Sequence, residues 1–371
     1  MSMVNWSAEH KEVIPVAQKK ALIAMSGGVD SSVAAYLAMD AGLSCIGGTM
    51  RLYEAEQPLP DAIPKQAADA QSVATRLGIP FHIFDCRDEF CSCVVDAFVK
   101  SYEDGLTPNP CIVCNQRLKF GLFLEKALEL GCDYVVTGHY ARIKHDPKSG
   151  RWVLQKAVDE AKDQSYFLYG LTQKQLSHTL FPLGELTKAQ AREIAEERGF
   201  VTAKKKDSQD ICFVPDGDYF TFMKHHTGHS YPEGDFLDRN GNVIGRHKNA
   251  VAYTLGQRKG LGLSMGEPVY VCDKDVVSNT VTVGPNDALM HRSLRAKDWF
   301  WHTIPQLTEP IRVYAKARSR MVAQPATIYP EENGFVRVEF DAPQRAITPG
   351  QAVVLYDGDV VVGGGTITEV I

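Results

Sequence analysis

The stretch that decides the fold is Ala21-Leu22-Ile23-Ala24-Met25-Ser26-Gly27-Gly28-Val29-Asp30-Ser31-Ser32. Its first five residues are apolar and predict a buried strand, and residues 32–41 predict a helix. The glycines between them let the backbone approach a ligand, the hydroxyls offer hydrogen bonds, and the helix start supplies unpaired N–H groups. The loop therefore predicts a pyrophosphate site. A glycine turn in which Ser and Asp serve only as caps is the weaker alternative.

The composition of this loop separates it from two better-known phosphate loops. No Lys follows the glycines, and the glycine spacing of the dinucleotide-binding turn is missing. Asp30 is suited to a Mg²⁺ ion or to capping the helix start. We therefore expect the ligand of the loop to be a nucleoside triphosphate, ATP, bound with Mg²⁺.

Outward from the loop, short apolar runs alternate with amphipathic stretches, which is typical of a parallel α/β sheet. Further strands are predicted at residues 44–50, 79–85 and 133–137, and helices at residues 67–77, 89–102, 116–130 and 186–195. Thr187 is expected to cap the last helix and Gly199 to end it. The order of the strands in the sheet cannot be read from the sequence.

After residue 217 the chain becomes rich in Gly and β-branched residues, with turn signals such as Asn240-Gly241. We predict an N-terminal extension (residues 1–18), an α/β catalytic domain (19–216), a small central β-rich module (217–285) and a C-terminal β-barrel (286–371). A chain of 371 residues is long enough for two or three such units.

Composition excludes several classes of protein. The chain has 44% hydrophobic and 23% charged residues, no apolar run of membrane-spanning length and no apolar signal-peptide core, so we expect a cytoplasmic protein without membrane contact. Nine cysteines, an odd number in a long chain, suit reduced thiols better than a disulfide framework. A net charge of −5 argues against diffuse binding to nucleic acid but allows a local basic patch.

Two cysteine centres stand out. Cys111 and Cys114 follow two prolines at a predicted helix start, where the helix dipole favours a thiolate. Cys212 follows a basic run, Lys204-Lys205-Lys206, which would also favour a thiolate. Such a pair suggests thiols that open and close a disulfide while sulfur moves. A zinc or iron–sulfur site that adds Cys91 and Cys93 is less favoured, because those two lie in an apolar helix pattern. The remaining cysteines, namely Cys45, Cys86, Cys132 and Cys272, are expected to be plain core residues.

The loop motif Ser-Gly-Gly-Val-Asp-Ser resembles that of the N-type ATP pyrophosphatases. Further motifs resemble the tRNA-specific 2-thiouridylases, over residues 20–356: Thr107-Pro108-Asn109-Pro110 with Cys114-Asn115, Thr137-Gly138-His139-Tyr140, Lys162-Asp163-Gln164-Ser165, Asp207-Ser208 with Ile211-Cys212-Phe213, Gly256-Gln257-Arg258, and Thr348-Pro349-Gly350-Gln351. The resemblance implies ATP-dependent insertion of sulfur at C2 of the wobble uridine in tRNAs for lysine, glutamate and glutamine. It also implies tRNA and an upstream sulfur-donor protein as partners.

The resemblance assigns roles residue by residue. Cys114 matches the nucleophile and Cys212 the cysteine that receives a persulfide, and the two are implied to form an alternate disulfide. The implied ATP-binding residues are Ala24, Met25, Ser26, Gly27, Gly28, Val29, Asp30, Ser31, Met50 and Gly138. Asn109, Pro110 and Cys111 would border the target base, and the implied tRNA contacts are His139, Lys162, Asp163, Gln164, Arg318, Ser319 and Gln351. Many relatives carry Asp where this chain has Cys111, which would shift proton transfer to water or another group.

A basic stretch supports RNA binding from the residues themselves. Arg312, Lys316, Arg318 and Arg320 lie in a segment without acidic residues, and alternation along a strand would place several on one face. A merely solvated strand face is nearly as good an interpretation. Two other functions stay open: an amide-forming synthetase with the same loop but no thiol pair, and a non-catalytic RNA-binding protein with a metal-stapled β module.

Overall fold

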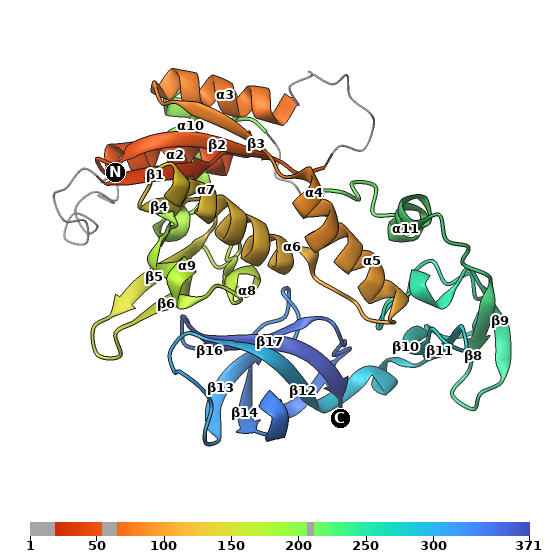
Figure 1. Ribbon diagram of the computed structural model, residues 1–371. Helices are drawn as coiled ribbons and strands as arrows, with labels where there is room; N and C mark the ends of the chain where they lie inside the picture. The colour runs from red at the N-terminus through yellow and green to blue at the C-terminus, as the bar shows by residue number, and fades with distance from the viewer. Residues whose placement is uncertain (1–18, 54–64, 206–210) are drawn as a thin grey trace. The chain divides into compact units, whose positions relative to one another are not determined.

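The computed structural model describes residues 19–53, 65–205 and 211–371 (Figure 1). The chain divides into two compact units, which are described separately below. Unit 1 comprises Met1–Val94, Cys111–Gln209 and Asp359–Val361, and unit 2 comprises Val95–Pro110, Asp210–Gly358 and Val362–Ile371. In the part of the chain that the structure describes, no helix combines the length and apolar character needed to cross a membrane.

A five-stranded parallel sheet forms the centre of unit 1, as the alternating pattern predicted. Its order is β3 (Phe81–Asp85), β2 (Ser44–Arg51), β1 (Lys20–Ala24), β4 (Tyr134–Val136) and β7 (Thr179–Leu180). The chain moves to one side of β1 through β2 and β3 and to the other through β4 and β7. Such a reversal opens a crevice at the carboxyl ends of the strands, and the loop after β1 lies there.

Two adjacent glycines of β2 show how helices cover both faces of this sheet. A Cβ atom at Gly47 would lie 3.5 Å from Cβ of Ala74 in α3 (Lys65–Leu77), and one at Gly48 would lie 2.9 Å from the ring of Phe123 in α7 (Phe123–Glu129). Successive strand residues point to opposite faces. The helices α3 and α7 accordingly lie on opposite sides of the sheet in Figure 1, with no room for larger side chains between.

Two predicted helices contain π-helical turns that the sequence pattern did not reveal. The first consists of α4 (Arg87–Phe90), η1 (Cys91–Val95) and α5 (Asp96–Glu103), and the second of α6 (Pro110–Val113), η2 (Cys114–Leu122) and α7. In a π-helix the hydrogen bonds run from residue i to residue i+5, and such turns are frequent at functional sites. Cys114 begins one of them.

The other helices of unit 1 include one whose ends were predicted correctly. They are α2 (Val29–Asp40), α8 (Ser165–Leu168), α9 (Gln173–Ser177), η3 (Pro182–Glu185) and α10 (Lys188–Glu197). Thr187 caps α10 in a capping box with Gln190, and Gly199 follows its end with φ of +63°. A hairpin of β5 (Ala141–Asp146) and β6 (Arg151–Lys156) was not predicted.

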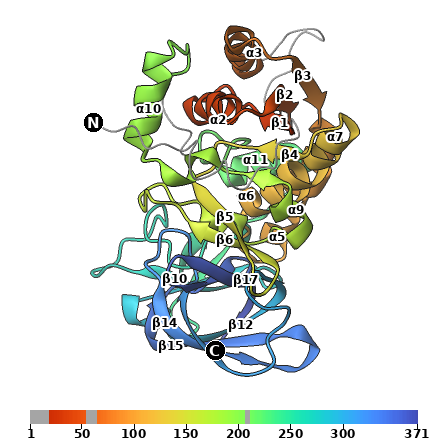
Figure 2. The same ribbon diagram turned by 90° about the vertical axis from the view of Figure 1, so that its left-hand side faces the viewer.

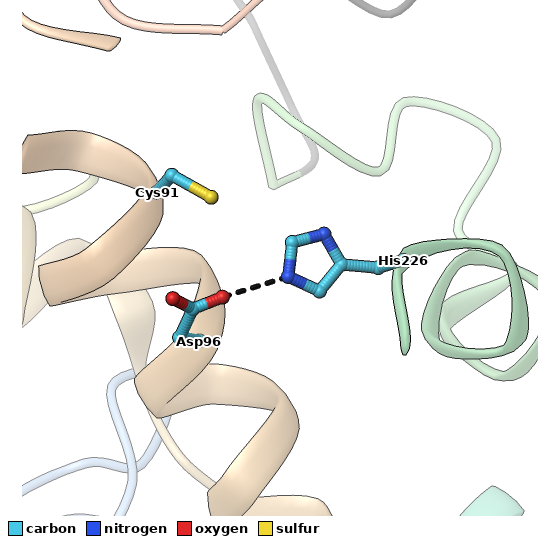
Figure 3. Close-up of side chains that lie close together, drawn as sticks. All are labelled: Cys91, Asp96 and His226. Atoms are coloured by element: carbon cyan, nitrogen blue, oxygen red, sulfur yellow. Dashed lines mark hydrogen bonds and ion pairs between the residues drawn. The ribbon is translucent and has the colours of Figure 1, made fainter. Parts of the chain in front are cut away.

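In unit 2, α5 packs against the start of the central module. That module contains α11 (Tyr219–Thr227), β8 (Gly234–Leu237), β9 (Val243–His247), η4 (Ala250–Ala252), β10 (Tyr270–Asp275), β11 (Thr280–Gly284) and η5 (Asn286–Leu289). Nε2 of His226 in α11 lies 2.7 Å from Oδ1 of Asp96 in α5 (Figure 3). Nδ1 of His229 lies 2.8 Å from Oε1 of Glu103, so two imidazole–carboxylate pairs hold the helices together.

A closed six-stranded antiparallel barrel ends the chain, which confirms the predicted β-barrel (Figure 2). Its strands, in spatial order, are β12 (Met290–Trp301), β15 (Val336–Arg345), β14 (Gln324–Pro330), β13 (Ile311–Lys316), β16 (Ala352–Asp357) and β17 (Val360–Val370), and η6 (Glu332–Gly334) precedes β15. Pairing of β17 with β12 closes the barrel. The predicted domain boundaries remain a prediction, since α5 clusters with unit 2 although it precedes residue 216.

Candidate adenylation and thiol site

The loop between β1 and α2 is held in shape by its own side chains. Gly27 has φ of +68°, and a Cβ there would lie 2.2 Å from the carbonyl oxygen of Gln66, so only glycine fits. The hydroxyls of Ser31 and Ser32 donate to the Gly28 carbonyl at 3.1 and 2.9 Å. These hydroxyls therefore brace the loop, whereas Ser26 is exposed and available to a ligand.

Asp30 has a different role from the predicted helix cap. Gly28 is the N-cap of α2 and has no side-chain cap, so the capping prediction is wrong. Both carboxylate oxygens of Asp30 accept from Nζ of Lys188 at 2.8 Å, and the hydroxyl of Tyr140 donates to Oδ1 at 2.9 Å. The loop, which has no lysine of its own, thus acquires an ammonium group from the start of α10.

A second lysine reaches the same loop from outside it. Nζ of Lys205 donates to the Gly27 carbonyl at 2.8 Å and forms an ion pair with Asp69 of α3. This lysine belongs to the basic run that was expected to act on Cys212, but its ammonium is engaged at the phosphate loop. Two ammonium groups, each paired with a carboxylate, therefore lie where the phosphates were predicted to bind.

The other predicted nucleotide contacts surround the loop. Met25 is buried, its N–H donates to the Gly48 carbonyl at 2.8 Å, and its own carbonyl accepts from Thr49. Ala24 and Met50 are partly exposed at the ends of β1 and β2. These contacts fix the carboxyl ends of the two strands beside the loop.

Gly138, just after β4, packs directly on the start of α2. A Cβ at this position would lie 2.6 Å from the carbonyl carbon of Asp30 and 2.7 Å from the amide nitrogen of Ser31. The residue is therefore a glycine because two backbones meet there. Its two neighbours, Thr137 and His139, belong to the part of the site that contains Cys114, which is called the thiol side below.

His139 is buried and neutral. Burial, and secondarily the ammonium of Lys119, hold the pKa of His139 well below its usual value. Nε2 lies 3.5 Å from Nζ of Lys119, and Nδ1 lies 2.6 Å from Oγ1 of Thr137. Since an ammonium can only donate, Nε2 accepts, and the ring proton on Nδ1 is donated to Thr137.

The two thiols of the proline-rich helix start differ in exposure. Cys111 is exposed and Cys114 is buried, with 8% of its surface accessible. Burial raises the pKa of both thiols, and Lys119 opposes that shift. The expected thiolate at Cys114 is therefore wrong for this conformation, because burial raises its pKa. The helix begins at Pro110, so Cys114 also lies beyond the first turn, to which the effect of the helix dipole is confined.

The segment that follows the β5–β6 hairpin is a hydrogen-bonded support. Oδ1 of Asp163 accepts from the N–H groups of Ala157 and Ser165, both at 3.1 Å. Oε1 of Gln164 accepts from the Tyr140 N–H at 2.9 Å, so Gln164 positions the tyrosine that contacts Asp30. Lys162, the third member of this predicted tRNA contact, is partly exposed.

In unit 2, Gln351 holds the proline-rich loop that leads to the predicted base contacts Asn109 and Pro110. Its Nε2 donates to the carbonyls of Thr107 and Pro108 at 2.8 and 3.3 Å. Gly350 lies against Thr107 with φ of +88°, and a Cβ there would be 2.8 Å from its amide nitrogen. A side chain predicted to touch tRNA therefore already has a role in shaping this loop.

The predicted alternation along β13 is present. Arg312 is exposed and pairs with Asp341, and Lys316 and Arg318 are partly exposed on the same face of the strand and its continuation. Nη2 of Arg318 donates to the Leu255 carbonyl at 3.0 Å and to Thr348 at 2.6 Å. The neighbouring Ser319 is also partly exposed.

Cys212 is exposed in unit 2, on a segment anchored by the residue that follows it. The ring of Phe213 is buried and lies edge-on to Phe98 of α5, with the centroids 5.2 Å apart. Asp207 and Ser208 of the same motif lie outside the described residues. Cys212 is thus an exposed residue on a segment that the buried ring of Phe213 anchors.

The cysteines assigned to other roles behave largely as predicted. Cys45, Cys86 and Cys132 are buried, and Cys272 is half-buried. Among the described residues, Cys91, Cys93, Cys111 and Cys114 do not gather into one set of metal ligands. This arrangement does not support a metal site built from those four thiols.

The sequence reasoning missed Lys119, Lys188 and Lys205 as members of the site. Lys188 follows a recognised N-cap and Lys205 lies in a recognised basic run, so both had a local signal but no indication of a partner. No local pattern indicated Lys119. In an ordinary α-helix, residues five positions apart do not share a face, so the sequence did not predict that Lys119 would lie on the same face as Cys114.

Comparison with known proteins matches each region in turn. Residues 19–216 match the family described as the tRNA methyl transferase HUP domain, residues 220–285 its PRC-barrel domain, and residues 291–367 the aminomethyltransferase beta-barrel domain. The tRNA-specific 2-thiouridylase of Clostridioides difficile (strain 630) is 47% identical over 95% of this chain and 98% of its own. That of Symbiobacterium thermophilum is 50% identical over 96% of this chain and 94% of its own. This chain therefore belongs to the tRNA-specific 2-thiouridylase family.

Proposed function

We propose that the protein uses ATP to place sulfur at C2 of the wobble uridine in tRNAs for lysine, glutamate and glutamine. The observation that carries the proposal is the Thr137-Gly138-His139 segment. Gly138 packs on the phosphate loop, and His139 contacts the lysine that acts on Cys114. One unit thus holds both an activating loop and a reactive thiol.

The C2 oxygen of uridine is a poor leaving group, so activation must come first. The oxygen attacks the α-phosphate of ATP, pyrophosphate leaves, and the adenylate then departs as AMP when sulfur attacks C2. The N–H groups at the start of α2, with Lys188 and Lys205 nearby, support the departing pyrophosphate. Gly138 lets the strand end pack closely against that helix start.

The sulfur step needs two thiols for the electrons to balance. A persulfide on Cys212 carries the sulfur. When the Cys114 thiolate attacks the inner sulfur of that persulfide, a disulfide forms and hydrosulfide leaves to attack C2. A reductant of the thiol class then restores both cysteines. Direct attack by the terminal persulfide sulfur, with Cys114 resolving afterwards, has the same balance.

Mg²⁺ does not have a ready ligand in Asp30, because Lys188 occupies both of its carboxylate oxygens. We propose that the ion arrives with the ATP phosphates, whose negative charge it offsets. We also propose that the exposed basic face of β13 contributes to tRNA binding, and that a separate sulfur-donor protein loads the exposed Cys212. Reduced thiols of this kind suit a cytoplasmic protein.

The test is incubation with ATP, Mg²⁺, unmodified tRNA and a persulfide donor that can load Cys212, followed by mass spectrometry of the nucleosides. We expect 2-thiouridine and release of pyrophosphate. Folded protein that produces no thiolated nucleoside would overturn the proposal. If ATP-dependent product formation persists in Cys212→Ser, an amide-forming synthetase becomes the better interpretation. Stoichiometric zinc without pyrophosphate release would instead favour a non-catalytic RNA-binding protein.

A further inference from the structure

The thiol side of the site contains a cation that neither the sequence motifs nor the comparisons assign. Lys119 lies on η2, five residues after Cys114, which is the interval that a π-helix brings onto one face. Its side chain is partly buried and points to His139 at 3.5 Å. The ammonium is therefore held in place beside the helix start that carries the thiols.

We propose that Lys119 is a positioning residue for the sulfur step: its ammonium, held by neutral His139, supplies the positive charge that lets Cys114 become a thiolate inside a buried site. The inference rests on the proposed role of Cys114 as the attacking thiol. Ionisation of Cys114 releases its proton to solvent.

The surroundings of His139 support this assignment. The Lys119 ammonium selects the tautomer in which Nε2 accepts, and the Thr137 hydroxyl accepts the proton on Nδ1. The ring centroids of Phe120 and Phe181 lie 5.8 Å from that of the imidazole. A protonated imidazole would face an ammonium inside an apolar wall, which is unfavourable. His139 therefore stays neutral and offers Lys119 an acceptor without cancelling its charge.

The groups that act on Cys114 give the sign of the effect. Burial raises the pKa of Cys114 and the neighbouring Cys111 thiol adds to the rise, whereas Lys119 lowers it. Lys119 lowers the pKa of Cys111 as well. Among the groups that influence Cys114, Lys119 thus favours its ionisation, so its removal leaves the burial effect unopposed.

Cys111 does not cancel the charge of Lys119. Burial raises the pKa of the Cys111 thiol, so this residue stays protonated and uncharged when Cys114 ionises. The ammonium of Lys119 is therefore left to Cys114.

The experiment measures the alkylation rate of Cys114 by iodoacetamide between pH 6 and 10, resolved by peptide mass spectrometry in a Cys111→Ser background. Lys119→Met is expected to move the midpoint of the rate upward by about one pH unit. Lys119→Arg, which keeps the charge, is expected to have a midpoint close to that of the protein with Lys119. Lys126→Met serves as the matched control, because Lys126 lies further along the same helical run and pairs with Glu129.

The outcomes separate the inference from the proposed function. An unchanged midpoint in Lys119→Met, with the fold confirmed by circular dichroism, overturns the role of Lys119 and leaves the sulfur chemistry intact. Full thiolation activity in Cys114→Ser overturns the role of Cys114 itself. A change in the maximal rate without a change in midpoint would show only altered access to the thiol, and it too contradicts the inference.

Discussion

The phosphate loop and the thiol-bearing helix start are built in opposite ways. In the loop, the hydroxyls of Ser31 and Ser32, the Asp30 carboxylate and the Gly27 carbonyl are all engaged, and two lysines from later segments are already attached. At the helix start, Cys114 is buried and its raised pKa keeps it protonated at neutral pH. The phosphate loop is therefore preorganised, whereas Cys114, in the proposed mechanism, depends on the charge of Lys119 to ionise in its buried position.

The two cysteines repeat this contrast on a smaller scale. Cys212 is exposed, which suits its proposed loading by another protein. Cys114 is shielded, which suits a group that must not react before the uridine is activated. Shielding a thiol until its substrate is ready prevents wasteful disulfide formation.

The largest expected effects come from two substitutions that stop sulfur transfer and leave the reaction at the phosphate loop intact. Cys114→Ser and Cys212→Ser are each expected to lower 2-thiouridine formation by at least about 100-fold, because each thiol is needed for the electron balance. Pyrophosphate release from ATP and tRNA should continue in both, since the loop is untouched. Loss of pyrophosphate release in either variant would mean that the halves are not independent. Cys45→Ser, in a buried core position, is a check on general thiol loss.

Gly138→Ala should impair both the phosphate loop and the thiol side of the site. The added methyl group would meet the backbone of Asp30 and Ser31, so we expect a loss of about 2 kcal/mol in stability and a lower rate of adenylation. Thermal unfolding and pyrophosphate release measure the two effects. Gly266→Ala is the matched control for stability, because a Cβ there meets no atom within 4 Å and that glycine does not have a positive φ.

Lys188→Met should affect only the loop. It removes the ammonium that both oxygens of Asp30 accept from, and we expect the KM for ATP to rise about tenfold, which corresponds to about 1.4 kcal/mol. The pH dependence of Cys114 alkylation should stay the same. A change in thiol reactivity would show that the two halves are coupled more closely than the contacts indicate.

The pH dependence of the alkylation rate should report only on the thiol side of the site. A raised pKa delays thiolate formation, so alkylation of Cys114 should reach half its maximal rate at a higher pH than a cysteine in an unfolded peptide. The same protein in denaturant provides the reference. If both midpoints agree, the burial of Cys114 in the folded protein has no effect on its ionisation.

The smallest effect is expected at Gln351. Gln351→Ala removes the donor to the Thr107 and Pro108 carbonyls, and we expect thiolation to fall about threefold, with the KM for tRNA and the rate changing together. Gln351→Glu, which cannot donate, should behave alike. An effect on the KM for tRNA alone would favour a direct RNA contact over a role in holding the loop.

The sequence was enough to predict the parallel α/β unit, the barrel and the loop between β1 and α2, because each has a local period or a short motif. It was not enough to predict that Lys188 would reach Asp30 or that Gln351 would hold Thr107. These partners lie 158 and 244 residues apart in the chain. The pKa of Cys114 was also predicted in the wrong direction, since burial depends on packing that no local pattern reports.

The Thr137-Gly138-His139 segment sets a length scale for the chemistry. Consecutive Cα atoms are 3.8 Å apart, so the groups that contact the phosphate loop and the thiol-side lysine are separated by a single peptide link. A rigid link of this kind acts as a spacer that cannot stretch. An insertion of one residue here would keep every side chain of the site but would break either the packing of Gly138 on α2 or the contact of His139 with Lys119.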